Sequence, residues 1–277
     1  MWNIYNTYGM KYARAGIQWS PVPFIFAGKR QDMKKALITG ANRGIGFEAA
    51  RQLLQLGYYV YLGSRILENG EEAVAKLKSE RLDSVEAVQI DVSDAASVKT
   101  AREAIGQKTS SLDVLINNAG ILGERGQTAT GTDISIYKEV YDTNLFGVID
   151  VTQAFLDMLR GSEAPRIVNV TSGLGSLTLH KDPTWKYYKI KAAAYNSSKA
   201  ALNMYTITLA YELQDTAFKV NAVDLGYTAT DFNNHNGTGT VEDAGARLVK
   251  AATIGIDGPT GMFFSDDNSP ETGISPW

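Results

Sequence analysis

The sequence predicts an α/β fold built on a doubly wound, parallel β-sheet in one domain. From residue 34 onward, short apolar runs alternate with longer stretches whose apolar residues recur at helical spacing. This alternation is typical of βαβ units with right-handed crossovers. A glycine-rich turn follows the first apolar run, and polar residues suited to chemistry follow several others. Ligands of such sheets bind at the carboxyl ends of the strands, so this placement favours the same fold.

The elements follow in chain order, with glycines and polar residues between them. We expect strands at residues 34–39, 58–63, 85–90, 112–116, 166–170 and 219–223, and a last short strand at 261–264. We expect helices at residues 45–56, 71–78, 95–105, 193–213 and 241–252, and a long one over 134–144 that continues through 145–159.

Composition narrows the classes of function. The chain has 277 residues, 44% hydrophobic and 21% charged, as in ordinary globular proteins. A net charge of −3 gives no overall basic field, and no run of roughly 18 apolar residues occurs, so we expect neither nucleic acid nor membrane as a partner. The chain has no cysteine, which fits a reducing compartment, and we expect a cytoplasmic protein. With only His180 and His235, we expect no metal site.

Residues 1–32 differ from the rest of the chain. They mix aromatic and polar residues without a period, and their charges are mostly basic. We interpret them as an N-terminal extension outside the fold, with the domain covering residues 33–277, because Met33 directly precedes the first strand. The basic bias leaves a transit peptide as the alternative.

The turn after the first strand reads Thr-Gly-Ala-Asn-Arg-Gly-Ile-Gly and opens the first helix. Its glycines allow a tight turn and close approach of the backbone to a pyrophosphate, and the helix N-terminus offers free N–H groups. Glycine spacing alone also fits a plain strand–helix turn. The residues expected to hold the phosphates are Gly40, Asn42, Arg43, Gly44, Ile45 and Gly46. The turn resembles the cofactor fingerprint of the classical short-chain dehydrogenases/reductases, whose Rossmann-type fold would cover nearly all of residues 34–264.

The end of the second strand predicts NADP(H) rather than NAD. Enzymes of this fold that use NAD carry an acid there, bonded to the ribose 2′-hydroxyl. Here Ser64 holds that position and Arg65 follows, while Arg43 lies in the glycine turn. Two guanidinium groups suit a 2′-phosphate, although Arg65 could also be an ordinary surface charge. Glu68 lies beyond the strand.

Two further segments resemble cofactor contacts of the family. Asp91 and Val92 follow the third strand and match its adenine contact; Asp91 could instead be a helix N-cap. The Asn-Asn-Ala-Gly segment after the fourth strand would place Asn118, Ala119 and Gly120 against the cofactor ribose.

The catalytic group is expected after the fifth strand. Tyr195 and Lys199 are four residues apart on a predicted helix and therefore share a face. A neighbouring ammonium favours a phenolate, so we expect Lys199 to lower the pKa of Tyr195, the acid/base of the reaction. By resemblance, Ser172 is the third catalytic residue, with Thr171 ranked second, and Asn144 holds a water in the proton relay. Asn144 could instead be a mid-helix amide bonded to backbone.

Two departures from the family pattern follow. Ser172 and Tyr195 are 23 positions apart, which is longer than usual, and the added stretch at 174–191 contains His180, Trp185, Tyr187 and Tyr188. We expect these aromatics to form a wall or lid of the substrate pocket. By resemblance, carbonyl reductases of the family also carry an insertion here, which can cover the helix face used for tetramers.

The second departure replaces the usual Pro-Gly after the sixth strand by Leu225-Gly226, so we expect a more mobile loop. Thr228 and Thr230 still match the residues that contact the nicotinamide carboxamide.

The sequence therefore predicts NADPH-dependent, reversible reduction of an aldehyde or ketone to an alcohol. The alternatives are an NAD-dependent alcohol dehydrogenase of the same fold and a non-catalytic NADP-sensing protein. An epimerase or dehydratase acting on sugar nucleotides is disfavoured, because few residues follow Gly226 to form a second domain. The sequence leaves the substrate, the stereochemistry and the choice between monomer and homo-oligomer open.

Overall fold

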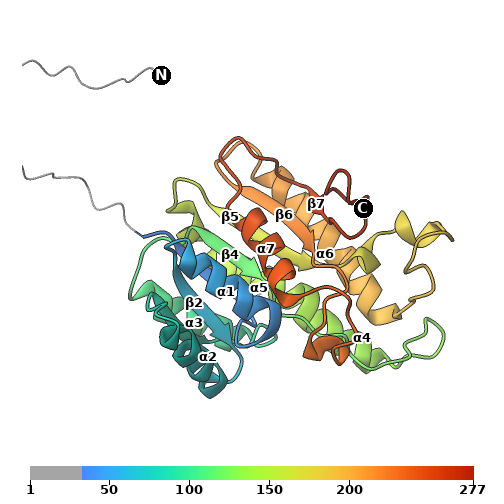
Figure 1. The fold of residues 1–277 in the computed structure, drawn as a ribbon, viewed down its shortest axis with the longest axis horizontal. Coiled ribbons are helices and arrows are strands. Elements are labelled where there is room, and N and C mark those ends of the chain that lie inside the picture. Colours follow the sequence, from blue (N-terminus) through green and yellow to red (C-terminus); the bar gives the residue numbers. More distant parts are fainter. Residues whose placement is uncertain (1–32) are drawn as a thin grey trace, which may run out of the picture. The chain divides into compact units, whose positions relative to one another are not determined.

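The computed structural model describes residues 33–277, which form one seven-stranded parallel sheet in the order β3-β2-β1-β4-β5-β6-β7 (Figure 1). The predicted extension at residues 1–32 lies outside the described residues. The strands are β1 (Lys35–Ile38), β2 (Tyr59–Ser64), β3 (Val85–Gln89), β4 (Val114–Asn117), β5 (Arg166–Thr171), β6 (Lys219–Asp224) and β7 (Phe263–Phe264). The helices are α1 (Gly44–Gln55), α2 (Leu67–Ser79), α3 (Ala95–Gly106), α4 (Ile134–Tyr141), α5 (Gly147–Arg160), α6 (Ala193–Glu212) and α7 (Val241–Ala252). The doubly wound parallel sheet is confirmed.

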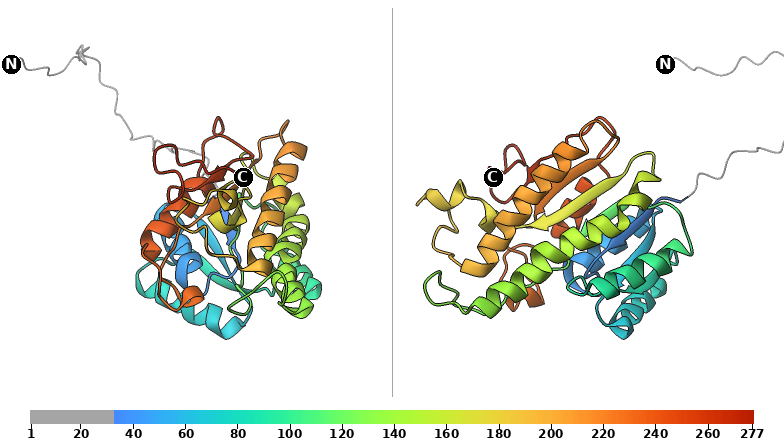
Figure 2. Two further views of the ribbon diagram at one scale, coloured as in Figure 1. Left: turned by 90° about the vertical axis from the view of Figure 1, so that its right-hand side faces the viewer. Right: turned by 180° about the vertical axis from the view of Figure 1, so that it is seen from behind.

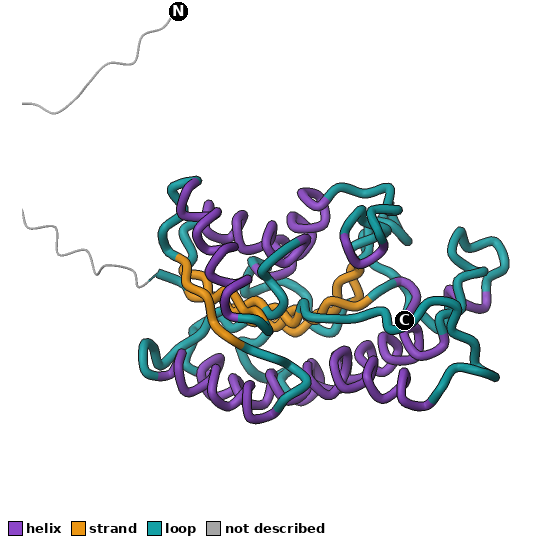
Figure 3. The backbone as a smooth tube through the Cα atoms, turned by 90° about the horizontal axis from the view of Figure 1, so that it is seen from below, coloured by secondary structure: helices purple, strands orange, loops and turns teal. Residues whose placement is uncertain are grey.

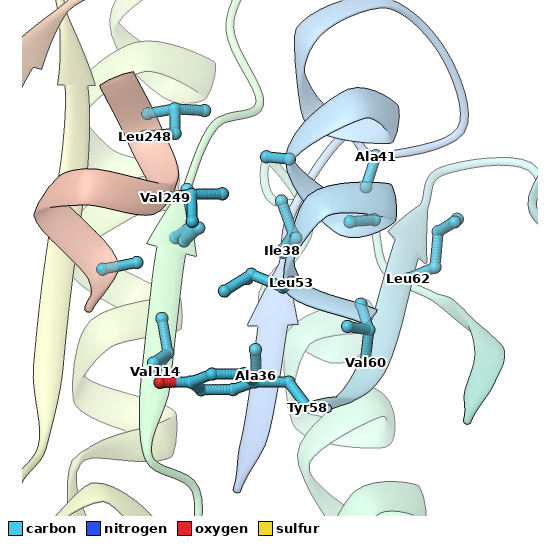
Figure 4. Packing of buried hydrophobic residues seen from close by; sticks show 14 of the residues in the cluster. Ala36, Ile38, Ala41, Leu53, Tyr58, Val60, Leu62, Val114, Leu248 and Val249 are labelled. Carbon is cyan, nitrogen blue, oxygen red and sulfur yellow. The ribbon is translucent and has the colours of Figure 1, made fainter. Parts of the chain in front are cut away.

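Helices cover both faces of the sheet (Figure 3). Side chains of a strand alternate between faces, so Ala36 and Ile38 point to one layer and Leu37 to the other. The first layer packs α1, α2 and α7 on the sheet, with Leu53 and Leu248 among its buried residues (Figure 4). The second layer packs α3, α5 and α6 on the opposite face, which is turned toward the viewer in the right-hand view of Figure 2. Strands buried on both faces explain the continuous apolar runs of the sequence.

The predicted long helix over 134–159 is interrupted. A π-helical turn at Asp142–Phe146 separates α4 from α5. Gly147 is the first residue of α5 and lies against the segment after β3. A Cβ on Gly147 would be 2.6 Å from the carbonyl oxygen of Val92. The winding changes next to the point where the helix passes the segment between β3 and α3, and π-turns of this kind are common at functional sites.

Helix α2 begins at Leu67, one turn before the predicted start at residue 71. Gly70 lies inside the helix, where an added Cβ would be 3.1 Å from the Cβ of Ser64. Other boundaries differ from the predicted ones by a few residues at most. No helix within residues 33–277 is both long and apolar enough to cross a bilayer.

Candidate active site

A cavity of about 680 Å³ opens at the carboxyl ends of β1, β4, β5 and β6. The strand order reverses between β1 and β4, and such a switch point leaves a crevice for a ligand. Most residues predicted to bind cofactor or act in catalysis line this one cavity: Gly40, Asn42, Arg43, Gly44, Ile45, Gly46, Arg65, Asp91, Val92, Asn118, Ala119, Gly120, Ser172, Tyr195, Lys199, Thr228 and Thr230.

The glycine turn is shaped for close approach. Gly40 and Gly44 have φ of +62° and +59°, which side-chain-bearing residues rarely adopt. A Cβ on Gly46 would lie 2.5 Å from Asn118 Nδ2 and 2.8 Å from the Gly40 carbonyl oxygen. Helix α1 begins at Gly44 without a side-chain cap. Its N-terminal N–H groups therefore face the cavity, and the turn fits a pyrophosphate.

A second hollow of about 380 Å³ lies beside the turn, where β2 ends. Ser64 occupies the end of β2, and its hydroxyl donates to the Ile66 carbonyl oxygen at 2.7 Å. Arg65 and Arg43 both line the hollow, as does Lys76, which the sequence reading did not include. Glu72 is the acid that lines it, whereas Glu68 does not. This set of cations suits a 2′-phosphate better than a bare ribose.

Arg43 also forms an ion pair with the loop after β6, which lines the cavity. Its Nη1 lies 3.0 Å from Asp231 Oδ2, and both side chains are largely exposed. Asp231 also accepts from His235 at 2.9 Å. Exposed ion pairs contribute little free energy, so Arg43 can exchange Asp231 for another anion.

Asp91 does not cap helix α3, so that alternative is wrong. Its Oδ1 accepts from the backbone N and the hydroxyl of Ser93, at 3.0 and 2.7 Å. The cap is Asp94, which accepts from Ala96 N. Asp91 thus shapes a turn at the rim of the cavity beside Val92.

The segment after β4 is bonded to the glycine turn. Asn118 Nδ2 donates to the carbonyl oxygens of Thr39 and Gly40, at 2.9 and 3.0 Å. Thr39 Oγ1 accepts in return from the backbone N of Asn118 and of Ala119. These bonds hold the two loops together as one surface of the cavity.

Tyr195 and Lys199 lie in the first turns of α6 and are both buried. The Lys199 Nζ donates to the Val170 carbonyl oxygen at 2.9 Å and lies 5.8 Å from the centre of the Tyr195 ring. Ser172 lines the same cavity, and its side chain is near enough to Tyr195 to act on the pKa of the phenol. Strand β5 and helix α6 thus bring together the three groups expected from the sequence, while Thr171 bonds to Asn203 at 2.6 Å inside the core.

The electrostatics of this group differ from the expectation. Burial raises the pKa of Tyr195 above its ordinary value; the Ser172 side chain acts in the opposite direction, and Asp224 adds to the rise. Burial lowers the pKa of Lys199 itself to about 8. Burial is therefore the largest effect on the phenol, and the protein keeps it protonated.

Asn144 is fully buried in the π-turn and does not line the cavity. Its Oδ1 accepts from Ile121 N at 2.8 Å, and its Nδ2 donates to the Ile121 carbonyl oxygen and to Ser198 Oγ. Both ends of the amide are therefore engaged within the protein. The alternative of an amide bonded to backbone describes this side chain, which positions the Ile121 loop against α6.

Hydrogen bonds take the place of the missing proline after β6. Gly226 has φ of +71°. The Leu225 carbonyl oxygen accepts from Arg247 Nη1 at 2.7 Å and from Thr228 Oγ1 at 3.0 Å. Thr230 N donates to Asn233 Oδ1 at 3.2 Å. The loop expected to be mobile is thus held from α7 and from within.

Comparison with known proteins agrees with this site. A model described as short chain dehydrogenase matches residues 34–240. The chain belongs to the short-chain dehydrogenase family. Short-chain dehydrogenase anuI of Penicillium roqueforti is 38% identical, over 84% of this chain and 94% of its own length. A (+)-neomenthol dehydrogenase of Capsicum annuum is 33% identical, over 86% and 97%.

Solved structures of the family superpose well. Salutaridine reductase from Papaver somniferum has a TM-score of 0.74 at 30% identity, covering 84% of this chain and 99% of that one. NADPH-bound carbonyl reductase from chicken fatty liver has a TM-score of 0.75 at 28% identity, covering 88% and 99%. As a short-chain dehydrogenase, the chain is an oxidoreductase acting on carbonyl or alcohol groups.

The insertion characteristic of this short-chain dehydrogenase contributes part of the substrate wall. Tyr187 lines the cavity, while His180, Trp185 and Tyr188 do not. Trp185 stands edge-on between the others, 5.1 Å from the His180 ring and 5.5 Å from the Tyr187 ring. The predicted wall is therefore one tyrosine backed by a second aromatic layer. Phe232 faces Tyr195 at 5.8 Å from the opposite side.

Gln127 is a positioning residue that sequence reasoning missed. Its Oε1 accepts from the backbone N of Ala194 and of Tyr195, at 2.9 and 3.0 Å. Its Nε2 donates to the carbonyl oxygens of Leu122 and Glu124. The catalytic helix has no cap of its own, so this buried amide supplies one from the loop after β4. No local pattern signals a cap that lies 67 positions away.

Proposed function

We propose that this short-chain dehydrogenase catalyses the NADPH-dependent, reversible reduction of an aldehyde or ketone to an alcohol. The observation that carries the proposal is the buried phenol of Tyr195, which lines one cavity together with Ser172, Lys199 and the glycine turn. A phenol kept protonated by burial is a proton donor, which suits reduction.

The residues act as follows in the proposed reaction. Ser172 donates a hydrogen bond to the carbonyl oxygen and stabilises the negative charge that develops there. Tyr195 gives its proton to that oxygen as the alcohol forms. Lys199 places an ammonium beside the phenolate that remains, opposing the cost of its burial. A bound nicotinamide supplies the hydride.

The preference for NADPH rests on the hollow at the end of β2. Three cationic side chains line it, namely Arg43, Arg65 and Lys76. Position 64, where an NAD enzyme carries an acid, holds a serine. The glycine turn and the uncapped start of α1 fit the pyrophosphate. The solved relatives that hold this cofactor include the carbonyl reductase named above. These observations favour NADPH over NADH as the reductant.

The proposal is tested by following absorbance of NADPH and of NADH against aldehydes, ketones, quinones and keto-steroids. We expect oxidation of NADPH with one or more cyclic ketones and at least a tenfold preference over NADH, because a paired phosphate contributes about 1.5–3 kcal/mol. Equal use of both cofactors would favour the NAD-dependent alternative. Tight NADPH binding without turnover of any carbonyl would favour the sensing alternative.

A further inference from the structure

The chain after β7 crosses the insertion at 174–191. Thr178 N donates to the Trp277 carbonyl oxygen at 3.1 Å, and Ser176 Oγ donates to that of Pro276 at 2.7 Å. Figure 1 shows the C-terminus beside β7, next to the insertion. Two consecutive residues of this terminal segment, Asp267 and Asn268, then contact the aromatic side chains of the insertion.

Asn268 bonds at both ends of its amide. Its Oδ1 accepts from Trp185 Nε1 at 3.0 Å, and its Nδ2 donates to Asp224 Oδ2 at 3.0 Å. The amide also lies against Gly173, directly after Ser172, so closely that a Cβ on Gly173 would overlap Asn268 Nδ2. Asn268 therefore connects the catalytic floor with the insertion.

Asp224 is the fixed end of this connection. Its carboxyl is buried at the end of β6 and accepts from Ser265 Oγ at 2.7 Å and from Gly226 N at 3.2 Å. A buried carboxylate is tolerated only with such donors, and removal of one leaves the others misaligned. Asp224 is thus a rigid anchor for Asn268.

Tyr187 is the end of the connection that faces the cavity. Its ring meets the Trp185 ring edge-on at 5.5 Å and that of Tyr227 at 6.3 Å. Its phenol donates to Asp267 Oδ2 at 3.0 Å, and Lys186 Nζ lies 2.8 Å from Asp267 Oδ1. Tyr187 faces the cavity, whereas Trp185 and Asn268 stand behind it.

We propose that Asn268 is a specificity-determining positioning residue: by joining Asp224 to Trp185 it holds Tyr187 as a rigid wall for bulky carbonyl substrates. A large cyclic substrate reaches this wall, and a small aldehyde bound at Ser172 does not. Loosening the wall therefore weakens transition-state binding of large substrates selectively. The inference rests on the proposed carbonyl reduction.

The test compares Asn268→Ala with wild-type protein in two assays. The first is kcat/KM for a keto-steroid divided by kcat/KM for a small aldehyde. We expect this ratio to fall about fivefold to tenfold, since a net hydrogen bond is worth about 1 kcal/mol. The second is limited trypsin digestion with fragment masses. We expect faster cleavage after the exposed Lys186 and Lys189, because the insertion is no longer held.

Two further variants, one from the same connection and one control, are compared with Asn268→Ala. Trp185→Phe keeps an aromatic ring and removes the N–H donor, so its ratio should fall in the same direction. Thr272→Ala lies in the same terminal segment, where the hydroxyl bonds to the backbone N and O of Ile274 and not to the insertion, and it should match wild type in both assays. Melting temperatures confirm that each variant is folded, and Trp185→Phe decides the matter if Asn268→Ala does not fold.

The possible results distinguish failure of the role assigned to Asn268 from failure of the proposed carbonyl reduction. With turnover in wild type, an unchanged substrate ratio in both variants overturns the inference, even if trypsin cleavage is faster. If wild type turns over no carbonyl, the proposed function fails. The trypsin comparison then decides the role of Asn268: unchanged protection overturns it, and faster cleavage supports it.

Discussion

Replacement of Lys199 by methionine should make the protein more stable and catalytically inactive. Lys199 is 4% exposed, and its Nζ has one hydrogen-bond acceptor among the described residues, the Val170 carbonyl oxygen. Burial lowers the pKa of this ammonium from 10.5 to about 8. Each unit is worth about 1.4 kcal/mol, so at pH 7 burial of the charge costs the folded state about 3 kcal/mol.

Methionine has a similar length and no charge. The variant avoids this cost but leaves the Val170 carbonyl oxygen without its donor, a loss of about 1–2 kcal/mol. We therefore expect a net gain of about 1–2 kcal/mol at pH 7 in the free energy of unfolding. This corresponds to a melting temperature higher by roughly 2–8 °C in a chain of this size.

The dependence on pH has a definite sign. The folded pKa lies below the unfolded one, so the penalty is complete below about pH 8. Between about pH 8 and 10.5 the unfolded chain holds the proton that the folded protein releases, and the penalty disappears as the pH rises. The stability difference between variant and wild type should therefore shrink from pH 7 to pH 10.

Urea unfolding without cofactor measures the free energy of unfolding of both proteins at pH 7 and at pH 10. The change in the variant–wild-type difference between the two pH values is the quantity to compare. Lys250→Met, at an exposed position of α7, is the matched control and should show no such dependence. A Lys199→Met protein that is less stable than wild type at pH 7 by several kcal/mol, or whose difference is independent of pH, would refute the reasoning.

Three further variants test the surrounding site. Arg65→Asp should raise the Kd for NADPH by about 10- to 100-fold and affect NADH much less, as measured by fluorescence titration; an unchanged preference would remove Arg65 from the phosphate site. Gln127→Leu should lower the free energy of unfolding by about 2–4 kcal/mol and reduce kcat, because the N–H groups that begin α6 lose their acceptor; wild-type values of both would contradict the capping role. Asp224→Asn removes a negative charge that raises the pKa of Tyr195, so the decline of carbonyl reduction at alkaline pH should begin at lower pH in rate profiles, and a shift to higher pH would reverse the assigned sign.

Local sequence patterns were enough to predict the sheet and the cofactor turns. Strands buried on both faces appear as apolar runs. Position 46 requires a glycine because the first helix lies in close contact with the segment after β4. Tyr195 and Lys199 could be paired because a helix brings positions four apart together. In each case the interacting residues are adjacent in sequence or joined by a regular element.

The parts that escaped prediction depend on contacts between distant segments. The π-turn lies directly before Gly147, which passes the Val92 carbonyl oxygen, and no helical period indicates this contact. No sequence pattern singles out Asp224, whose partner Asn268 lies 44 positions away. The pKa of Tyr195 was expected to fall because of a neighbouring charge, whereas burial is the larger effect. Burial depends on the packing of the whole molecule.

The central claim is that Tyr195 supplies the proton to the carbonyl oxygen. Single-turnover oxidation of NADPH by Tyr195→Phe, with a ketone that wild type reduces, tests it most directly, because only the phenol oxygen is removed. We expect a Kd for NADPH near the wild-type value and a rate lower by about 10²–10⁴-fold. A rate within a few-fold of wild type would contradict the assignment of Tyr195 as proton donor.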